Sequence, residues 1–457
     1  MKLIIENCLF YQFKVIDFYC YSTLRNRMNN TTYILKRACL NNIYDKMYSN
    51  DVSNICQYIF KQLARVEFAP NSELRTIGGG AFASSALASI KIPASVVELK
   101  DGWCYGTDEL HHAEVEAGNA VYASVGGKCI IGKSDIRNED YDTLVLFALG
   151  TVEAAIPGTI KIIGPYAFAC AKLASIEIPS HVTQICEGAF FDCRQLARVE
   201  FAPNSEFRTI GKNAFSYTKL ASIEIPSHVT QIGEGAFCYC KQLARVEFAP
   251  NSELRTIGGG AFASSALASI KIPASVVELK DGWCYMTDEL HHAEVEAGNA
   301  VYASVGGKCI IGKSDIRNED YDTLVFLARD TVEATIPGTI KIIGPYAFSC
   351  TKLASIEIPS HVTQICEGAF YYCGQLARVE FAPNSELRTI GKNAFSYTKL
   401  ASIEIPSHVT QIGEGAFNYC EQLQVVEIEG NSVDESTYKD RFHKSKIVML
   451  PARNRLH

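Results

Sequence analysis

The chain has 457 residues, of which 47% are hydrophobic and 20% are charged, and its formal net charge is -7 at pH 7. This composition is typical of a folded protein and excludes the disordered and collagen-like classes. The mildly acidic balance provides no basic surface for a nucleic acid, and the sequence contains no uncharged run of about 18 apolar residues that would span a membrane.

The N-terminal segment, residues 1–60, differs from the rest of the chain because it carries no repeat. Charged residues break up its first twenty positions, so no apolar run is long enough for the core of a secretory signal. Farther along, a roughly helical spacing relates Ile34, Leu35, Leu40, Ile43 and Met47. We therefore expect a non-repeat segment in which a short helix, within residues 31–61, is the candidate cap of the domain that follows.

Residues 61–240 and 241–420 are two copies of one sequence. The run KQLARVEFAPNSELRTIGGGAF begins at Lys61 and begins again at Lys241, 180 residues later. The copies differ at only a few places, such as Gly106/Met286, Phe191/Tyr371, Arg194/Gly374 and Cys238/Asn418. So close an identity indicates a recent internal duplication.

A shorter unit of 23 or 24 residues recurs inside each copy, and Leu173, Leu196 and Leu220 open three successive units. This period, with its Leu-x-x-Ile-x-Ile opening, is typical of a leucine-rich repeat. Over Leu173–Ile178 the apolar and polar residues alternate as they do in a half-buried strand. Pro179 then ends the strand, because proline cannot donate a hydrogen bond to a ladder.

One such unit cannot bury its own apolar edge, whereas stacked units bury continuous apolar columns and pair every strand with its neighbours. We therefore predict a β-rich solenoid over residues 61–430, a right-handed leucine-rich-repeat superhelix of short strands and corner turns. A last strand is expected at Val425–Glu429. Residues 431–457 are expected to form a C-terminal cap and tail, with a closing strand at Ile447–Leu450.

One stretch of each copy, residues 117–147 and 297–327, is too long for a single unit. In the first copy, Lys128–Ile131 and Thr143–Leu146 have the composition of two strands, joined by a polar loop at Asp135–Asp142. We therefore expect a β-hairpin inserted into the solenoid in each copy.

The chain contains 17 cysteines. Six of them follow an Ala-Phe pair by two or three positions, namely Cys170, Cys193, Cys240, Cys350, Cys373 and Cys420. A cysteine placed once per repeat is better explained as a small buried hydrophobe than as half of a disulfide. An odd total also leaves at least one thiol unpaired.

A longer motif, Ile-Pro-x-x-Val-x-x-Ile-x-x-x-Ala-Phe-x-x-Cys, is present at Ile178–Cys193, Ile225–Cys240, Ile358–Cys373 and Ile405–Cys420. Together with the Leu-x-x-Ile-x-Ile opening it closely resembles the BspA-like leucine-rich repeats, over about residues 61–430. The inserted hairpin, with its Tyr-x-x-x-Gly-Gly-Lys step at Tyr122–Lys128, also looks like one in that family. The resemblance implies a solenoid of the kind found in surface proteins of host-associated bacteria and parasitic protists, where such repeats are linked to adhesion to host matrix or cells.

The pairs His111-His112 and His291-His292 are the strongest candidates for metal binding or catalysis. His112 and Glu114 lie two positions apart on one predicted strand and so face the same side, but the preceding unit adds only a lysine. Because a metal site needs more converging ligands, surface histidines explain the pattern better.

The glycine run Gly78-Gly79-Gly80 lacks the Lys-Ser/Thr step of a phosphate-binding loop and is better explained as a repeat turn. No serine or cysteine stands in a recognisable nucleophile motif with a paired base. The sequence therefore predicts no catalytic, cofactor or metal site.

One surface pattern suggests a binding face on the exposed side of the strands. Eight glutamates occupy one position of the strand in successive units, namely Glu177, Glu200, Glu224, Glu247, Glu357, Glu380, Glu404 and Glu427. Stacking would bring such carboxylates about 5 Å apart, at a repulsion of about 1 kcal/mol per pair in water. Arginines two residues earlier partly offset this repulsion, namely Arg198, Arg245 and Arg378. Lys91 and Lys271 interrupt the stripe.

Two interpretations of this face remain open. It is either a solvated sheet surface whose arginines balance its glutamates, or an acidic ribbon that contacts a basic protein partner or divalent cations. From the repeats we expect a non-catalytic protein-binding solenoid, and the resemblance implies adhesion to host or matrix proteins at a cell surface or after secretion. The alternatives are an intracellular, cytoplasmic interaction scaffold, in keeping with the missing signal and anchor, and a decaying repeat protein with no active role.

Overall fold

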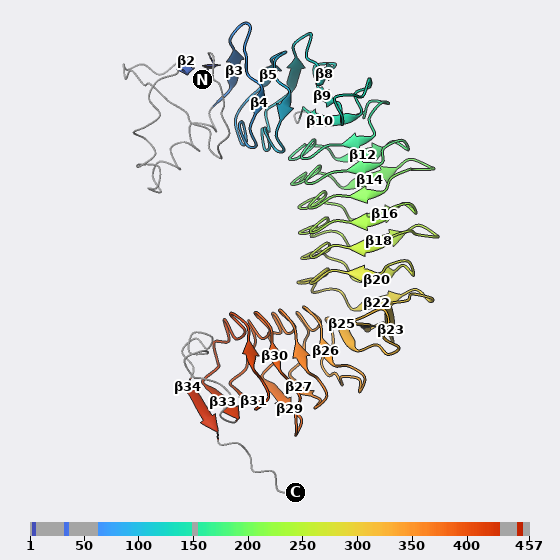
Figure 1. Cartoon of the computed structure of the whole chain (residues 1–457), viewed down its shortest axis with the longest axis vertical. Helices are drawn as coiled ribbons and strands as arrows, with labels where there is room; N and C mark the ends of the chain where they lie inside the picture. The colour runs from blue at the N-terminus through green and yellow to red at the C-terminus, as the bar shows by residue number, and fades with distance from the viewer. Residues whose placement is uncertain (1, 6–31, 36–62, 149–153, 430–445, 451–457) are drawn as a thin grey trace. The chain divides into compact units, whose positions relative to one another are not determined.

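The computed structural model describes residues 2–5, 32–35, 63–148, 154–429 and 446–450. Strands and turns make up these residues, and no helix occurs among them. They belong to two compact units, Met1–Leu220 and Ala221–His457. In each unit, short strands from successive turns of the chain stack side by side, as Figure 1 shows. The predicted β-solenoid is therefore confirmed.

A regular coil of the solenoid contains two strands, one of four residues in a first column and one of two residues in a second column. In the coil that begins at Leu173 these are β12 (Ser175–Ile178) and β13 (Gln184–Ile185). The side chains of Ile176 and Ile178 are buried, while Ser175 and Glu177, which alternate with them, are exposed, as the alternation predicts. The second-column strands were not predicted, since two residues are too few to show a periodic pattern.

The described residues of the first unit form fifteen strands, which belong to the first column, the second column or the insertion. The first column holds β1 (Lys2–Ile5), β2 (Thr32–Leu35), β3 (Arg65–Phe68), β5 (Ser89–Ile92), β7 (His112–Val115), β12 (Ser175–Ile178) and β14 (Arg198–Phe201). The second column holds β4 (Thr76–Ile77), β6 (Glu98–Leu99), β10 (Thr143–Phe147), β11 (Ile162–Ile163), β13 (Gln184–Ile185) and β15 (Thr209–Ile210). The insertion adds β8 (Tyr122–Val125) and β9 (Cys129–Gly132).

The second unit has the same organisation. Its first column holds β16 (Ser222–Ile225), β18 (Arg245–Phe248), β20 (Ser269–Ile272), β22 (His292–Val295), β27 (Ser355–Ile358), β29 (Arg378–Phe381), β31 (Ser402–Ile405), β33 (Val425–Glu429) and β34 (Lys446–Leu450). Its second column holds β17 (Gln231–Ile232), β19 (Thr256–Ile257), β21 (Glu278–Leu279), β25 (Thr323–Leu327), β26 (Ile342–Ile343), β28 (Gln364–Ile365), β30 (Thr389–Ile390) and β32 (Gln411–Ile412). The second insertion adds β23 (Tyr302–Val305) and β24 (Cys309–Gly312).

The two columns differ in how continuously their strands pair. In the second column β25, β26, β28, β30 and β32 form one uninterrupted sheet, and the last four pair in parallel. In the first column β27 pairs with β29, and β31 pairs with β33, but the two pairs form separate sheets. The expectation that every strand pairs with both neighbours was therefore wrong for β29 and β31, although it holds for β3 and β5, which belong to one continuous first-column sheet of the first unit.

The lengths of the turns account for the break in the first column. Residues 359–363 join β27 to β28, whereas a longer turn, residues 382–388, joins β29 to β30. Adjacent coils still share a backbone hydrogen bond before the strands begin, from Lys399 N to Leu376 O at 2.9 Å. We infer that the longer turn carries β29 away from β31 along the rest of their length.

The insertions are three-stranded antiparallel meanders rather than two-stranded hairpins. β9 and β10 were predicted, and they pair antiparallel as expected. A third strand, β8, precedes them and was missed. Its signal was the step Gly126-Gly127, where both residues have positive φ and Lys128 N donates to Val125 O at 3.1 Å, as in a tight hairpin turn.

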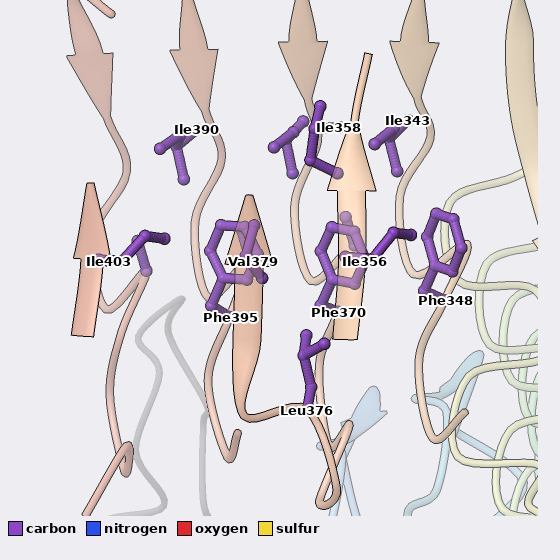
Figure 2. Packing of buried hydrophobic residues seen from close by; sticks show 14 of the residues in the cluster. Ile343, Phe348, Ile356, Ile358, Phe370, Leu376, Val379, Ile390, Phe395 and Ile403 are labelled. Carbon is purple, nitrogen blue, oxygen red and sulfur yellow. The ribbon is translucent and has the colours of Figure 1, made fainter. Parts of the chain in front are cut away.

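Stacked phenylalanine rings form the centre of the core in each unit. In the second unit Phe348, Phe370, Phe395 and Phe417 follow one another at centroid distances of 4.7, 5.0 and 5.4 Å with nearly parallel planes. Figure 2 shows the first three of these rings in a row, with isoleucines of both strand columns beside them. Each of these four coils therefore contributes one ring to a continuous column.

The repeated cysteines lie where the sequence predicted, beside these rings. Cys193, Cys373 and Cys420 are buried, and the Cys193 thiol donates to Phe168 O at 3.0 Å. Cys170 and Cys350 are only partly buried. The core role predicted for the repeated cysteines is therefore confirmed for the buried ones and holds in part for Cys170 and Cys350.

The ends of the chain are described only in part. Of the expected helical cap, residues 32–35 are described, and they form strand β2, which pairs in parallel with β1. Strand β2 therefore replaces helix there, and the rest of that segment lies outside the described residues. Strands β33 and β34 agree with the predicted last and closing strands and pair in parallel with each other.

Candidate functional site

The predicted binding face lies on the first-column strands. Within each ladder the glutamates stand directly opposite each other, Glu177 against Glu200 and Glu357 against Glu380. Further such pairs are Glu224 with Glu247 and Glu404 with Glu427. All eight side chains are exposed or partly exposed, because the alternate residues of the strands fill the core.

Arginines neutralise one carboxylate of each ladder in which they occur. Arg198 pairs with Glu200, Arg245 with Glu247, and Arg378 with Glu380, each within one strand. These contacts confirm that the arginines and glutamates share one face. A ladder such as β12–β14 carries two glutamates and one arginine, so it keeps one excess negative charge.

The ladders beside the insertions have a different charge pattern. Lys91 stands opposite Glu114 in β5–β7, and His112 contacts Glu114 at 3.1 Å on the same strand. Gly127 of the meander lies against the His112 ring, since a Cβ at that glycine would come within 2.5 Å of the His112 Cε1 atom. His112 therefore forms part of the support for the insertion.

A second surface feature, which we call the corner column, was not predicted from the sequence. It consists of one residue per coil. This residue lies two positions after the buried Ala-Phe pair that follows the second-column strand, or after the buried Trp-Cys pair in the coils of Gly106 and Met286. Every member has a positive φ between 54° and 69°. In the first unit the members are Ser84, Gly106, Cys170, Asp192 and Tyr217, and in the second Tyr239, Ser264, Met286, Cys350, Tyr372, Tyr397 and Tyr419.

Backbone hydrogen bonds between coils hold the corner residues in this left-handed conformation. Asp192 N donates to Ser216 O at 2.9 Å, and Tyr372 N donates to Ser396 O at 3.0 Å. The side chains therefore project outward from one edge of the coil. The alternation of buried and exposed side chains along a strand does not apply to them. The sequence signal for this edge was the divergence of the two copies at Phe191/Tyr371 and Arg194/Gly374.

Three tyrosines of the corner column, of which Tyr372 and Tyr419 are exposed and Tyr397 is partly exposed, stack on one another in the second unit. Tyr372 and Tyr397 have centroids 4.3 Å apart, and Tyr397 and Tyr419 have centroids 4.4 Å apart, with interplanar angles of 23° and 13°. The spacing follows from the distance between stacked coils. Because the ring faces cover one another, this stack presents mainly ring edges and hydroxyl groups to solvent.

The described residues offer little for metal binding or nucleophilic catalysis. Among them, no group of three or more His, Cys, Asp or Glu side chains is arranged to hold a metal ion. Burial raises the pKa of the Cys373 thiol to about 12 and that of the Cys186 thiol to about 11, so both are protonated at neutral pH and are weak nucleophiles. None of the described residues belongs to a helix that could cross a membrane.

The chain is similar to solved structures of bacterial leucine-rich-repeat proteins. The pneumococcal vaccine antigen PcpA matches with a TM-score of 0.57 and 22% identity, over 69% of this chain and 82% of that one, which shows the fold alone. A leucine rich cell surface protein from Faecalibacterium prausnitzii A2-165 matches with a TM-score of 0.55 and 25% identity, over 73% of this chain and 95% of that one. No curated protein matches the chain in sequence.

A family model also matches the sequence directly. The BspA type leucine-rich repeat region matches in 6 copies, over residues 4–111, 161–290 and 325–450. The first match begins inside the segment, residues 1–60, that showed no repeat by inspection. The matched ranges cover most of the chain. The chain therefore belongs to the BspA type leucine-rich repeat family.

Proposed function

We propose that this chain is a non-catalytic protein-binding solenoid that acts at a cell surface, where it contacts host or matrix proteins as an adhesin. The observation that carries the proposal is the set of exposed glutamate and arginine ladders on the first-column strands. Membership of a repeat family supports a protein-binding role. The cell-surface relative from Faecalibacterium prausnitzii supports the location.

The charge of the ladders favours a basic segment of the partner. In β12–β14 the arginine engages Glu200, which leaves Glu177 opposite it as the excess carboxylate. The corresponding excess carboxylates are Glu224 in β16–β18 and Glu357 in β27–β29. A lysine or arginine of a partner would relieve the repulsion across each ladder while it forms a new ion pair.

The test reverses the charge of these three exposed carboxylates in the full chain, as Glu177→Lys, Glu224→Lys and Glu357→Lys. An exposed ion pair contributes about 0.2–1 kcal/mol. Loss of three pairs, with repulsion in their place, should therefore weaken binding about tenfold or more. The measurement is binding to a panel of purified extracellular-matrix proteins by surface plasmon resonance.

A matched control makes the same change of charge on the turns. Glu206, Glu253 and Glu386 are equivalent exposed glutamates of the turn after the first-column strand. Their replacement by lysine should leave the affinity nearly unchanged. Equal losses in the two triple variants would show only a general charge effect and would remove the strand face as the binding surface.

A specific observation favours an intracellular scaffold as the second candidate. Buried cysteines of the described residues, such as Cys104, Cys193 and Cys373, are free thiols, as in proteins of a reducing compartment. Labelling of intact cells that produce the protein, with an amine reagent that does not cross membranes, separates the two. Labelled protein supports the adhesin, and protein labelled only after lysis supports the scaffold.

A further inference from the structure

The corner column of the first unit contains a polar pocket of about 390 Å³. This volume lies at the small end of the range for ligand sites. Its charged walls come from three coils, with Asp108 on one, Lys172 on the next, and Asp192 and Arg194 on a third. The Tyr105 ring forms a further wall. None of these residues belongs to the strand face discussed above.

The two copies differ at Gly106/Met286, Leu146/Phe326, Phe147/Leu327, Leu149/Arg329, Gly150/Asp330, Ala155/Thr335, Ala169/Ser349, Ala171/Thr351, Phe191/Tyr371, Asp192/Tyr372, Arg194/Gly374, Phe207/Leu387 and Cys238/Asn418. Four of the first-copy residues, Gly106, Ala171, Asp192 and Arg194, line the pocket. Ten residues line it, a small fraction of a 180-residue copy, so evenly scattered differences would rarely gather there. The pocket is therefore a place where the copies have become chemically distinct.

In the second copy, uncharged residues replace the charged pair and a methionine replaces the glycine. The second copy has Tyr372 and Gly374 where the first has Asp192 and Arg194, and Met286 where the first has Gly106. The carboxylate, the guanidinium and the glycine thus occur together only in the first copy.

The polar groups of the pocket are held in place by contacts within the protein. Arg194 contacts the Asp192 carboxylate through two nitrogens, with Nε to Oδ1 at 2.7 Å and Nη2 to Oδ2 at 3.2 Å. The Tyr105 ring makes edge contacts with Tyr166 and Phe191, each at a centroid distance of 5.9 Å. Side chains that are already ordered lose little conformational freedom when a ligand binds.

The charges of the pocket indicate a neutral ligand. Two carboxylates, Asp108 and Asp192, are balanced by Lys172 and Arg194, so the pocket has no net charge with which to select an anion or a cation. It instead offers acceptors on the carboxylates and donors on the lysine, the arginine and the Gln195 amide. Vicinal hydroxyl groups donate and accept at once, so they can satisfy such a mixed set.

The Tyr105 side chain adds what a sugar ring requires besides hydrogen bonds. Its aromatic ring is an apolar wall for the C–H groups of a pyranose. Burial raises the pKa of the Tyr105 phenol, which is therefore protonated at neutral pH. We propose that this pocket binds one neutral sugar residue, either a free monosaccharide or the end of a glycan.

The test uses the methyl glycosides of glucose, galactose, mannose and N-acetylglucosamine as probes of the full chain, by saturation-transfer difference NMR. The disrupting variant is Gly106→Met, which fills the pocket. The backbone accepts this change, because Met286 has a φ of 54° at the equivalent position and Gly106 has 69°. We expect saturation transfer from at least one glycoside to the natural chain, and an at least fivefold reduction in the variant.

The reciprocal variant builds the pocket in the second copy, with Met286→Gly, Thr351→Ala, Tyr372→Asp and Gly374→Arg in the Gly106→Met background. We expect it to restore saturation transfer. Immobilised neutral oligosaccharides, compared with the free glycosides, show which of the two sources binds.

The same experiment includes methyl glucuronide as an acidic probe. The proposal would be overturned if no neutral glycoside received saturation transfer from the natural chain, or if the natural chain and Gly106→Met gave equal transfer. Transfer to methyl glucuronide alone would overturn it as well. Failure of the rebuilt second-copy pocket to bind would equally contradict the assignment of the site to these residues. Failure of the strand-face variants to affect protein binding would leave this pocket untouched, since the two surfaces share no residue.

Discussion

Replacing one ring of the phenylalanine column should loosen the solenoid locally. The change is Phe370→Ala. The Phe370 side chain is 0% exposed and stacks on Phe348 at 4.7 Å and on Phe395 at 5.0 Å. A buried Phe→Ala change costs about 3–5 kcal/mol, and each aromatic contact contributes about 0.5–1.5 kcal/mol of that total. Because cross-coil hydrogen bonds hold the neighbouring backbone in place, the cavity cannot collapse, and we expect about 4 kcal/mol.

The assay is hydrogen–deuterium exchange of the full chain, followed by mass spectrometry of its peptides. A loss of about 4 kcal/mol corresponds to about a thousandfold faster exchange wherever opening of that region controls the rate. In a solenoid each coil contacts only its neighbours, so the effect should be confined to the coils around β27, β29 and β31. Coils of the first unit, such as that of β12 and β13, should keep their protection.

A neighbouring phenylalanine provides the matched control. Phe381 packs against the same core cluster but is only partly buried, so Phe381→Ala should cost about 1 kcal/mol. If Phe370→Ala accelerated exchange evenly throughout the chain, or no more than Phe381→Ala did, the stacked column would not be the local source of stability inferred here.

Two more predictions concern the meander and the thiols. Gly127→Ala should lower the thermal unfolding temperature more than Gly126→Ala. Both residues have a left-handed φ, but only at Gly127 would a Cβ meet the His112 ring. His112→Ala in the Gly127→Ala background should therefore remove the difference. Equal effects of the two glycine variants would show that the His112 contact is unimportant. Burial raises the pKa of Cys373 to about 12 and that of Cys238 to about 11, above the value of about 8.5 in unfolded chains. These thiols therefore stabilise the fold fully below about pH 8.5, and they stabilise it progressively less as pH rises toward their folded-state pKa values. Denaturant midpoints measured from pH 8 to 10.5 should therefore fall with pH, and less steeply in a Cys373→Ala, Cys238→Ala variant; parallel falls would contradict this cause.

Much of the fold follows from the sequence because the same pattern of apolar and polar residues recurs in successive repeats. The alternation over Ser175–Ile178 predicts which side chains enter the core, and the structure buries Ile176 and Ile178 as expected. The strands of two residues and the meander strand at Tyr122–Val125 were missed. Such short segments hold their conformation through bonds to neighbouring coils, which a local pattern does not encode.

The candidate sites were predictable to different degrees. The position of the glutamates on one exposed face follows from the two-residue period of a strand, whereas their role in binding stays a prediction. The corner column could not be derived in the same way, since nothing in the identity of Asp192 or Tyr372 predicts a positive φ. Only the sequence differences between the two copies indicate that edge.

The left-handed backbone of the corner column also limits how this edge can evolve. Its twelve members include serine, glycine, cysteine, aspartate, methionine and tyrosine, but no valine, isoleucine or threonine. Branching at Cβ is strongly disfavoured at positive φ. Mutation can therefore exchange charged, sulfur-containing or aromatic side chains along this edge without disturbing the core, whereas side chains that branch at Cβ are excluded from it.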